Sequence, residues 1–288
     1  MSYKFTVEAN GLKLASFLKN AFQDKFSAKL IKKTIEKGCC RVNKRVIDYS
    51  NHQLKKGDEI DIVIKEPLIA VAPEVLYEDP GFIIIFKPPG IVSEEKSLKN
   101  FFNHPLYLVH RLDKETSGLL IVAKTPEMKG ELDRLFKNRL ILKRYIALVD
   151  GHILQNSGII EVPLEEVKKD HHAIKVMASK ASGVMAKTEW KKLGLGLQST
   201  FMEFDIITGK THQIRAHAAH IGHAVLGDPI YLKKPSCTYL PEGLCLHAYY
   251  LKFSHPLTQK IIEIYAKPPV HFLKALKHLV TNAKMPRY

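Results

Sequence analysis

The chain has 288 residues, which is enough for two domains or for one large and one small domain. Its composition, 45% hydrophobic and 25% charged, is that of a soluble globular protein and excludes a wholly disordered chain. The charge is unusual, because 44 Lys and Arg residues against 29 Asp and Glu residues leave a formal net charge of +15. Such an excess predicts a polyanionic partner, with nucleic acid as the first candidate and an acidic membrane surface as the second.

No secretory or membrane segment is expected. The N-terminus lacks the continuous apolar region of a signal peptide, and the longest strongly apolar run, residues 82–86, is far shorter than the ~20 residues of a membrane span. We therefore expect a cytoplasmic protein.

The cysteines fit neither a paired zinc-ligand pattern nor a disulfide framework, and we expect them to be reduced and to pack in the core. They are Cys39, Cys40, Cys237 and Cys245.

The first 65 residues predict a small basic domain. Apolar residues at helical spacing indicate helices near residues 14–21 and 30–35, the second ended by Gly38. Short strands are expected at 40–43 and 61–64, with Gly57-Asp58 as the turn before the second. Ten basic and two acidic residues lie between Lys13 and Arg45. A merely solvated helix face mixes both signs, so this imbalance favours binding of a polyanion.

This segment resembles a known RNA-binding module. The two helices are followed by Ile35-Glu36-Lys37-Gly38, by Arg41-Val42-Asn43 and by Leu54-Lys55-Lys56-Gly57-Asp58-Glu59-Ile60. This order is similar to that of the S-four-type (alpha-L) RNA-binding domain and would cover residues 10–65. The resemblance implies a surface that grips structured RNA chiefly through phosphates. The candidate RNA contacts on it are Lys32, Lys33, Arg41 and Lys44.

The rest of the chain is rich in predicted strands. Pro67 and Pro73 bracket a linker, and a second domain is expected over residues 74–288. Strands are predicted at 75–77, 82–86, 119–123, 145–149, 174–177, 201–207, 246–253 and 261–265. Helices are predicted at 127–137, 211–221 and 270–280. This order indicates an α+β fold with a mixed, mostly antiparallel sheet.

One loop displays a carboxylate. After the apolar residues 107–109, the chain enters a charged stretch that ends in the turn Thr116-Ser117-Gly118 before a new apolar strand. Asp113 lies in this stretch, and its neighbours Arg111 and Lys114 would keep it ionised at neutral pH. Taken alone, the same pattern also describes a turn with solvated charges.

Four ordered motifs resemble those of the RluA-type pseudouridine synthases. They are Lys87-Pro88-Pro89-Gly90; His110-Arg111-Leu112-Asp113 with Thr116-Ser117-Gly118-Leu119-Leu120; Arg144-Tyr145-Ile146-Ala147-Leu148-Val149 with Gly151; and Gly209-Lys210-Thr211-His212-Gln213-Ile214-Arg215 with His217, Gly227-Asp228 and Tyr231. Lys210 stands where the family usually has Arg, which keeps the charge but would weaken a bidentate phosphate contact. The resemblance implies an enzyme that converts uridine within RNA to pseudouridine without metal or cofactor.

The resemblance also assigns roles to residues. Asp113 would be the essential carboxylate, acting either as a nucleophile on the ribose or as a base at its 2′ position. Tyr145 would pack on the target base and take part in proton removal from carbon 5. Arg215 would pair with Asp113 and keep it charged and oriented. Arg111 would help to extrude the uridine and fill its place in the stack, and His110 beside it is a further candidate RNA contact.

Several alternatives remain open at this point. A metal site is possible in principle in a cluster of histidines, but no carboxylate stands at zinc-protease spacing, so packed or RNA-facing histidines are favoured. That cluster comprises His212, His217, His220 and His223. By similarity, family members with this N-terminal module commonly act on large-subunit ribosomal RNA, and transfer RNA is the alternative. A non-catalytic RNA-binding or ribosome-assembly factor would bind RNA tightly and make no pseudouridine. We expect a monomer.

Overall fold

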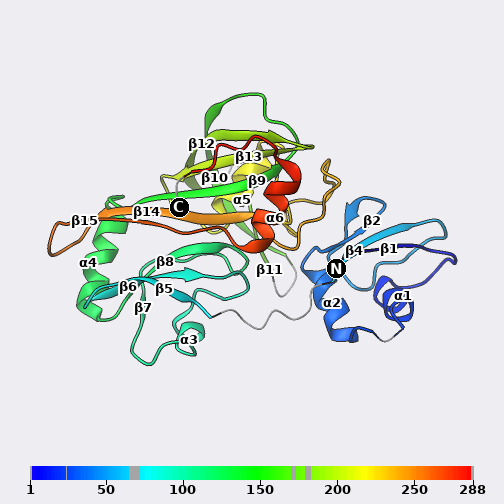
Figure 1. The fold of residues 1–288 in the computed structure, drawn as a ribbon, viewed down its shortest axis with the longest axis horizontal. Coiled ribbons are helices and arrows are strands. Elements are labelled where there is room, and N and C mark those ends of the chain that lie inside the picture. The colour runs from blue at the N-terminus through cyan, green and yellow to red at the C-terminus, as the bar shows by residue number, and fades with distance from the viewer. Residues whose placement is uncertain (1, 24, 65–71, 170–172, 179–182, 287–288) are drawn as a thin grey trace.

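The computed structural model describes residues 2–23, 25–64, 72–169, 173–178 and 183–286. Residues 2–64 form one part of the molecule, drawn in blue, and the remaining residues form a larger part built on one long sheet (Figure 1). The predicted linker falls mainly on residues 65–71, which lie outside the described residues. Within the described residues, no helix is long and apolar enough to cross a membrane.

The N-terminal part packs two helices on a four-stranded sheet of order β1-β4-β2-β3. Its elements are β1 (Ser2–Thr6), α1 (Leu14–Ala21), α2 (Ala28–Glu36), β2 (Cys40–Val42), β3 (Arg45–Val46) and β4 (Glu59–Val63). Leu14 and Leu18 of α1 and Ile31 and Ile35 of α2 share one core with Ile62 of β4. Both helices and the strands β2 and β4 lie where the sequence predicts them. The strands β1 and β3 were not predicted, since β3 has two residues and β1 lies against the core on one side only.

The larger part is an eleven-stranded sheet whose main path is β11-β10-β12-β13-β9-β14-β8-β6-β5, with β15 beside β14 and β7 beside β8. Its strands are β5 (Glu74–Glu78), β6 (Phe82–Lys87), β7 (Tyr107–Leu108), β8 (Ser117–Ala123), β9 (Leu142–Asp150), β10 (Ser157–Lys169), β11 (Ala173–Ala178), β12 (Val184–Gly196), β13 (Ser199–Ile206), β14 (Leu246–Ser254) and β15 (Ile261–Tyr265). Among the described strand pairs, β8 and β14 alone run parallel. The predicted α+β fold with a mixed, mostly antiparallel sheet is confirmed.

Helices cover both faces of this sheet. They are α3 (Glu95–Leu98), α4 (Pro126–Lys137), α5 (Gln213–His220) and α6 (Val270–Leu279). Leu132 of α4 shares a core with Phe82 of β6 on one face. Phe272 of α6 lies in a second core, which includes Ile83 on the opposite face. Neighbouring residues of β6 therefore point into different cores, and burial on both faces explains its continuous apolar sequence.

The two longest strands, β10 and β12, were not predicted. Each spans 13 residues, and β12 alternates between exposed and buried positions. Charged side chains such as Glu161, Lys187 and Lys191 occupy these strands, which dilutes the apolar pattern that marks a buried strand. The cysteines are placed as expected, because all four are buried as reduced thiols.

Candidate active site

A cleft of about 1430 Å³ brings together side chains from distant parts of the chain. Asp113 enters it from the loop between β7 and β8, Tyr145 from β9 and Arg215 from α5. Arg111, Lys143 and His212 also line it. The structure therefore places the three residues that the sequence singled out for catalysis in one cleft.

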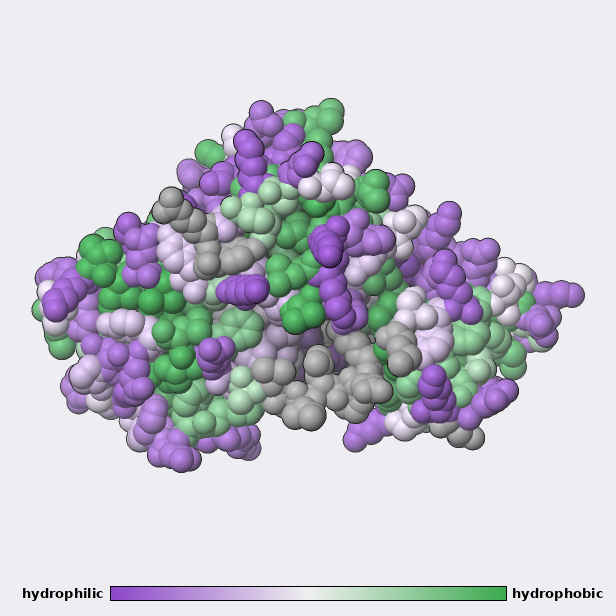
Figure 2. Space-filling view, in the orientation of Figure 1, coloured by the Kyte–Doolittle hydropathy of each residue, from purple (hydrophilic) through white to green (hydrophobic). Residues whose placement is uncertain are grey.

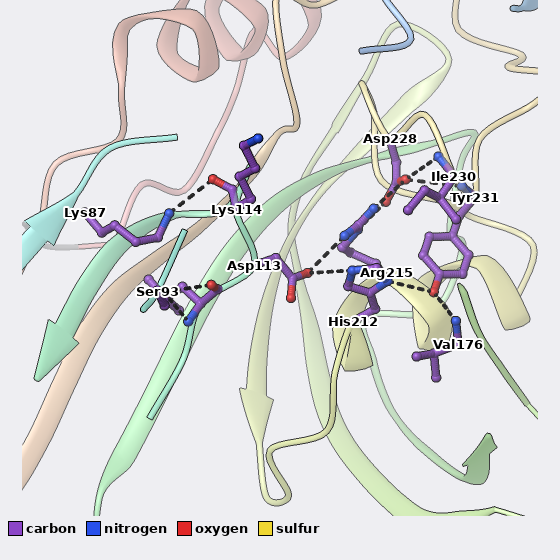
Figure 3. Close-up of polar contacts among 11 residues, drawn as sticks. Lys87, Ser93, Asp113, Lys114, Val176, His212, Arg215, Asp228, Ile230 and Tyr231 are labelled. Atoms are coloured by element: carbon purple, nitrogen blue, oxygen red, sulfur yellow. Dashed lines mark hydrogen bonds and ion pairs between the residues drawn. The ribbon is translucent and has the colours of Figure 1, made fainter. Parts of the chain in front are cut away.

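Buried hydrogen bonds hold the backbone around Asp113. The Ser93 hydroxyl donates to the Leu112 carbonyl at 2.8 Å and accepts from the Leu112 amide at 3.1 Å. The fully buried Lys87 ammonium donates to the Lys114 carbonyl at 3.2 Å, as Figure 3 shows, and also to the carbonyls of Pro88 and Ile91. Burial lowers the pKa of Lys87 to about 7. Buried side chains thus hold the backbone of the loop, while the Asp113 side chain remains about one-fifth exposed.

The turn after Asp113 requires a glycine. Gly118 has a φ of +124°, and a Cβ atom there would lie 2.2 Å from the Ala248 carbonyl oxygen. Gly118 is also where β8 pairs with β14, the parallel neighbour that in turn pairs with the Tyr145 strand. The absence of a side chain at this position lets the two strands approach and sets the spacing of the cleft.

Arg215 is shared between two carboxylates. Its Nη1 donates to Asp113 Oδ2 at 3.0 Å, while Nε and Nη2 donate to Asp228 Oδ2 at 2.7 Å and Oδ1 at 3.0 Å (Figure 3). The Asp228 side chain is fully buried and also accepts from the amides of Ile230 and Tyr231. Asp228 therefore fixes the orientation of the guanidinium through Nε and Nη2, and Nη1 contacts Asp113.

The charges of this pair are firmly set. Burial opposes ionisation of Asp228, but the Arg215 guanidinium and the hydrogen bonds to the carboxylate hold its pKa below the ordinary value. Burial likewise opposes the charge of Arg215, yet Asp228 and Asp113 raise the pKa of the guanidinium further above neutrality. Arg215 consequently stays cationic beside Asp113 over the physiological range.

His212 gives Asp113 a second neighbour. Its Nε2 lies 3.8 Å from Asp113 Oδ2, and its Nδ1 lies 3.2 Å from the Tyr231 hydroxyl, which accepts from the Val176 amide (Figure 3). Burial and the nearby Arg215 charge lower the pKa of His212. A neutral ring that accepts from Tyr231 at Nδ1 carries its proton on Nε2, toward Asp113. The sequence placed His212 in a motif but did not indicate this contact.

Tyr145 is buried in the wall of the cleft. It pairs with Phe204 of β13 and with Ala248 of β14 in the sheet. Burial and, second, the charge of Asp113 raise the pKa of its phenol above the ordinary value. Tyr145 therefore keeps its proton at neutral pH, and the described residues offer its hydroxyl no hydrogen-bond partner, which leaves that group available to a bound base.

Lys143 is a cleft residue that the sequence analysis did not single out. Its ammonium lies 5.1 Å from the centroid of the Phe136 ring, and burial lowers its pKa to about 8. No ion pair to Lys143 occurs in the described part of the chain. The signal available in the sequence was its position two residues before Tyr145.

The expected RNA contacts fall into two groups. Arg111, Lys32, Lys33 and Lys44 are exposed. His110 instead accepts a hydrogen bond from the Ile121 amide at 2.9 Å and packs on Phe136, and burial lowers its pKa to about 3. Arg41 is 3% exposed and donates to the carbonyls of residues 237–239. Arg41 therefore points into the protein, whereas His110 is half-buried and lines the cleft.

Comparisons with known proteins identify the family. A family model described as RNA pseudouridylate synthase matches residues 81–220. The chain is 32% identical over 271 residues to an uncharacterized RNA pseudouridine synthase of Synechocystis, covering 86% of this chain and 83% of that protein. The chain belongs to the RNA pseudouridine synthase family.

Further relatives agree with this pseudouridine synthase assignment. A ribosomal large subunit pseudouridine synthase D of Haemophilus influenzae is 30% identical over 313 residues, covering 97% of this chain and 94% of that one. The solved structure of human RNA pseudouridylate synthase domain containing 1 superposes with a TM-score of 0.64 at 25% identity, over 77% of this chain and 94% of that one. This synthase is therefore an isomerase that modifies RNA.

Proposed function

We propose that this pseudouridine synthase acts on large-subunit ribosomal RNA and that Asp113 is its essential carboxylate. The similarity to the Haemophilus influenzae large-subunit synthase supports the substrate, because it extends over nearly the full length of both chains and includes the basic N-terminal part. Transfer RNA is the alternative substrate that the experiment below distinguishes.

The observation that carries the assignment of Asp113 is its sharing of Arg215 with Asp228. The buried Asp228 takes two guanidinium nitrogens, so the third nitrogen faces a carboxylate that is itself open to the cleft. Asp113 thus lies beside a fixed cation and presents an oxygen to a substrate. Such a carboxylate suits either a nucleophile or a base.

The other cleft residues fit the steps that the isomerisation needs. The glycosidic bond must break, the uracil must rotate, a carbon–carbon bond must form and a proton must leave carbon 5. Tyr145 offers a ring and a protonated hydroxyl at the wall next to Asp113. Arg111 is exposed at the cleft, which supports its proposed role of filling the stack that an extruded uridine vacates.

Residues 10–65, most of the N-terminal part, are proposed as the alpha-L RNA-binding domain, and residues 74–288 as the catalytic domain. The N-terminal part has its own sheet and core. Lys32 and Lys33 are exposed on α2, and Lys44 is exposed on the hairpin between β2 and β3. These positively charged side chains suit phosphate contacts, which fix the position of RNA without reading its sequence.

An Asp113→Asn variant tests the catalytic proposal. Tritium release from RNA labelled with [5-³H]uridine is expected to be lost, while binding of the same RNA in a filter assay persists. Product formation by Asp113→Asn would show that the carboxylate lies elsewhere. A wild-type enzyme that binds RNA and releases no tritium from it would favour the non-catalytic alternative.

Mapping of pseudouridines tests the substrate. Total RNA from cells with and without the gene is treated so that reverse transcription stops at each pseudouridine. We expect a stop in large-subunit ribosomal RNA that disappears without the gene and returns with the wild-type gene but not with Asp113→Asn. Loss of a stop in transfer RNA alone would replace the proposed substrate.

A further inference from the structure

The N-terminal part is docked on the segment that follows Asp228. Arg41 Nη1 donates to the carbonyls of Cys237 and Thr238 at 3.1 and 2.9 Å, and Nη2 donates to the Tyr239 carbonyl at 3.1 Å. The Val46 amide donates to the Lys233 carbonyl at 3.1 Å, and Lys233 pairs with Asp48. A buried arginine with three carbonyl partners makes this a specific contact and not a loose encounter of two surfaces.

The close fit extends to α2 and its end. Gly38 has a φ of +70°, and a Cβ atom there would lie 2.8 Å from Pro229 Cβ. Lys37 beside it lies 3.9 Å from Glu115, a residue of the Asp113 loop. The N-terminal part therefore contacts the two segments that flank the cleft.

A groove of about 510 Å³ opens along this junction, and both parts of the molecule line it. We call it the seam groove. The residues that line it are Val42, Asn43, Lys44, Arg45, Ile47, Tyr49, His52, Gln53, Lys55 and Asp58 from the N-terminal part and Lys234 and Pro235 from the larger part. Figure 2 shows hydrophilic side chains interspersed with apolar ones over the N-terminal part, at the right of the view.

The seam groove is positively charged. Lys44, Arg45, Lys55 and Lys234 line it, and the described residues hold no ion pair for any of these four. Its single carboxylate, Asp58, is already engaged, because it accepts from the Asn43 amide group at 2.8 Å and from the Lys55 backbone amide at 2.8 Å. Four cations against one carboxylate leave the groove with an excess of positive charge, which suits phosphate binding.

An aromatic ring lies among these cations. Tyr49 is 49% exposed in the groove, and its hydroxyl lies 2.9 Å from His52 Nδ1. The His52 ring contacts Tyr49 edge-on, with ring centroids 5.4 Å apart. This contact restricts the tyrosine without covering its ring. An exposed aromatic ring between basic side chains is the arrangement that stacks a nucleic-acid base and holds its phosphates.

The hairpin that carries two of the cations has a fixed shape. Asn43 and Lys44 have φ angles of +50° and +67°, which is the conformation of a type I′ turn between β2 and β3. The Asn43 side chain bonds to Asp58 and accepts from the Glu59 amide at 2.9 Å. Lysine is an unfavourable residue at a positive φ, so Lys44 occupies this position at some conformational cost.

The seam groove and the catalytic cleft share one short loop. Pro229 and Ile230 line the cleft, and Lys234 and Pro235 line the seam groove. Lys234 follows Ile230 by four positions in the sequence, so their Cα atoms are at most ~14 Å apart. The two sites are therefore close enough for one RNA strand to contact both.

We propose that the seam groove binds an unpaired nucleotide of the RNA substrate near the target uridine, with its base on Tyr49 and its phosphates on Lys44, Arg45 and Lys234. This inference rests on the proposed function and adds a second RNA contact that only the docked arrangement of the two parts creates. RNA is preferred over an acidic protein surface, since the groove combines an open aromatic ring with four cations.

The test uses the full-length enzyme and RNA from cells that lack the gene, labelled with [5-³H]uridine and separated into large-subunit ribosomal and transfer RNA. Tyr49→Ala is expected to raise KM ~5-fold or more with a smaller change in kcat, whereas Tyr49→Phe keeps the wild-type KM because the ring remains. Lys44→Gly removes a cation, so KM is expected to rise. The same change removes the conformational strain of a lysine at a positive φ, so the fold is not weakened. The slope of log KM against log salt should also become shallower by about 0.7.

Lys260→Ala is the matched control, because Lys260 is exposed on the turn between β14 and β15, away from the groove, and its removal changes the net charge equally. Wild-type KM values for both Tyr49→Ala and Lys44→Gly would overturn the groove proposal, as would equal effects of Lys44→Gly and Lys260→Ala. Activity on the transfer RNA fraction alone would overturn the proposed substrate, and the groove variants are then compared on that fraction. If the wild type modifies neither fraction, filter binding of the same RNAs still compares the variants.

Discussion

Arg215 contacts Asp113 through a single nitrogen, Nη1 at 3.0 Å, and commits its other two contacts to the buried Asp228. The two carboxylates are thus unequal partners of one cation. Asp228 has no exposed side-chain surface, whereas Asp113 keeps one-fifth of its side chain in the cleft. Asp228 orients the guanidinium, and Asp113 is the carboxylate that we propose to react.

Substitution of Asp228 and substitution of Asp113 should lower the stability of the protein by different amounts. Asp228→Asn removes the fully buried partner of Arg215 and leaves the guanidinium only its single contact with the partly exposed Asp113, so we expect the free energy of unfolding to fall by ~3–5 kcal/mol. Asp113→Asn should lower it by less than ~1 kcal/mol, because Arg215 retains Asp228. Urea denaturation measures both values. Equal losses in the two variants would contradict the unequal roles given to these residues.

Tyr145→Phe keeps the ring in the cleft wall and removes only the hydroxyl. If that hydroxyl takes part in proton removal from carbon 5, kcat should fall ~10²-fold or more. Stability should change by less than ~1 kcal/mol, since the hydroxyl has no hydrogen-bond partner among the described residues. Tritium release at saturating RNA gives kcat, and a variant with wild-type kcat would confine Tyr145 to a packing role.

The RNA affinity of the cleft should depend on pH through Lys143. Its pKa of about 8 lies below that of an ordinary lysine, so its ammonium loses the proton as the pH rises from 7 to 9. We expect KM to increase over this range because a cation that faces the RNA disappears. Lys143→Arg, which stays charged, should show a flat profile at low KM, and Lys143→Met a flat profile at high KM. A rise in KM that persists in Lys143→Arg would assign the titration to another group.

Acid should destabilise the protein through His247. This fully buried ring has one nitrogen 2.9 Å from the Ser117 hydroxyl and the other 3.0 Å from the Ala266 carbonyl, and burial lowers its pKa from 6.5 to about 4. Between these two pH values the unfolded chain binds the proton and the folded chain does not, so stability is lost as the pH falls.

The size of this pH effect on stability follows from the binding of one proton by His247. The free energy of unfolding of the wild type should decrease relative to His247→Gln by up to ~1.4 kcal/mol per pH unit between pH 6 and 4.5. Urea denaturation at several pH values measures the difference. His278→Gln, at an exposed histidine, should follow the wild type. Parallel curves for the wild type and His247→Gln would refute the prediction.

Local sequence patterns predicted many of the helices and strands. The run at residues 82–86 is apolar at every position because β6 is buried on both faces, and the spacing of Ile31 and Ile35 marks the buried side of α2. The ordered motifs also indicated that Asp113, Tyr145 and Arg215 belong together, and the structure places them in one cleft. Strands β10 and β12 escaped prediction, because a half-exposed strand with charged residues has a weak apolar signal.

The tertiary structure alone decided how these side chains are used. Residue type predicted RNA contacts for both Arg41 and His110, yet packing turns Arg41 toward three carbonyls of a loop nearly two hundred residues away and ties His110 to β8. The division of Arg215 between Asp113 and Asp228 likewise depends on where α5 and two loops meet. Local sequence determines the spacing of apolar residues, the charge and the chemical groups of each segment. The direction and burial of a side chain depend instead on which distant segments pack around it.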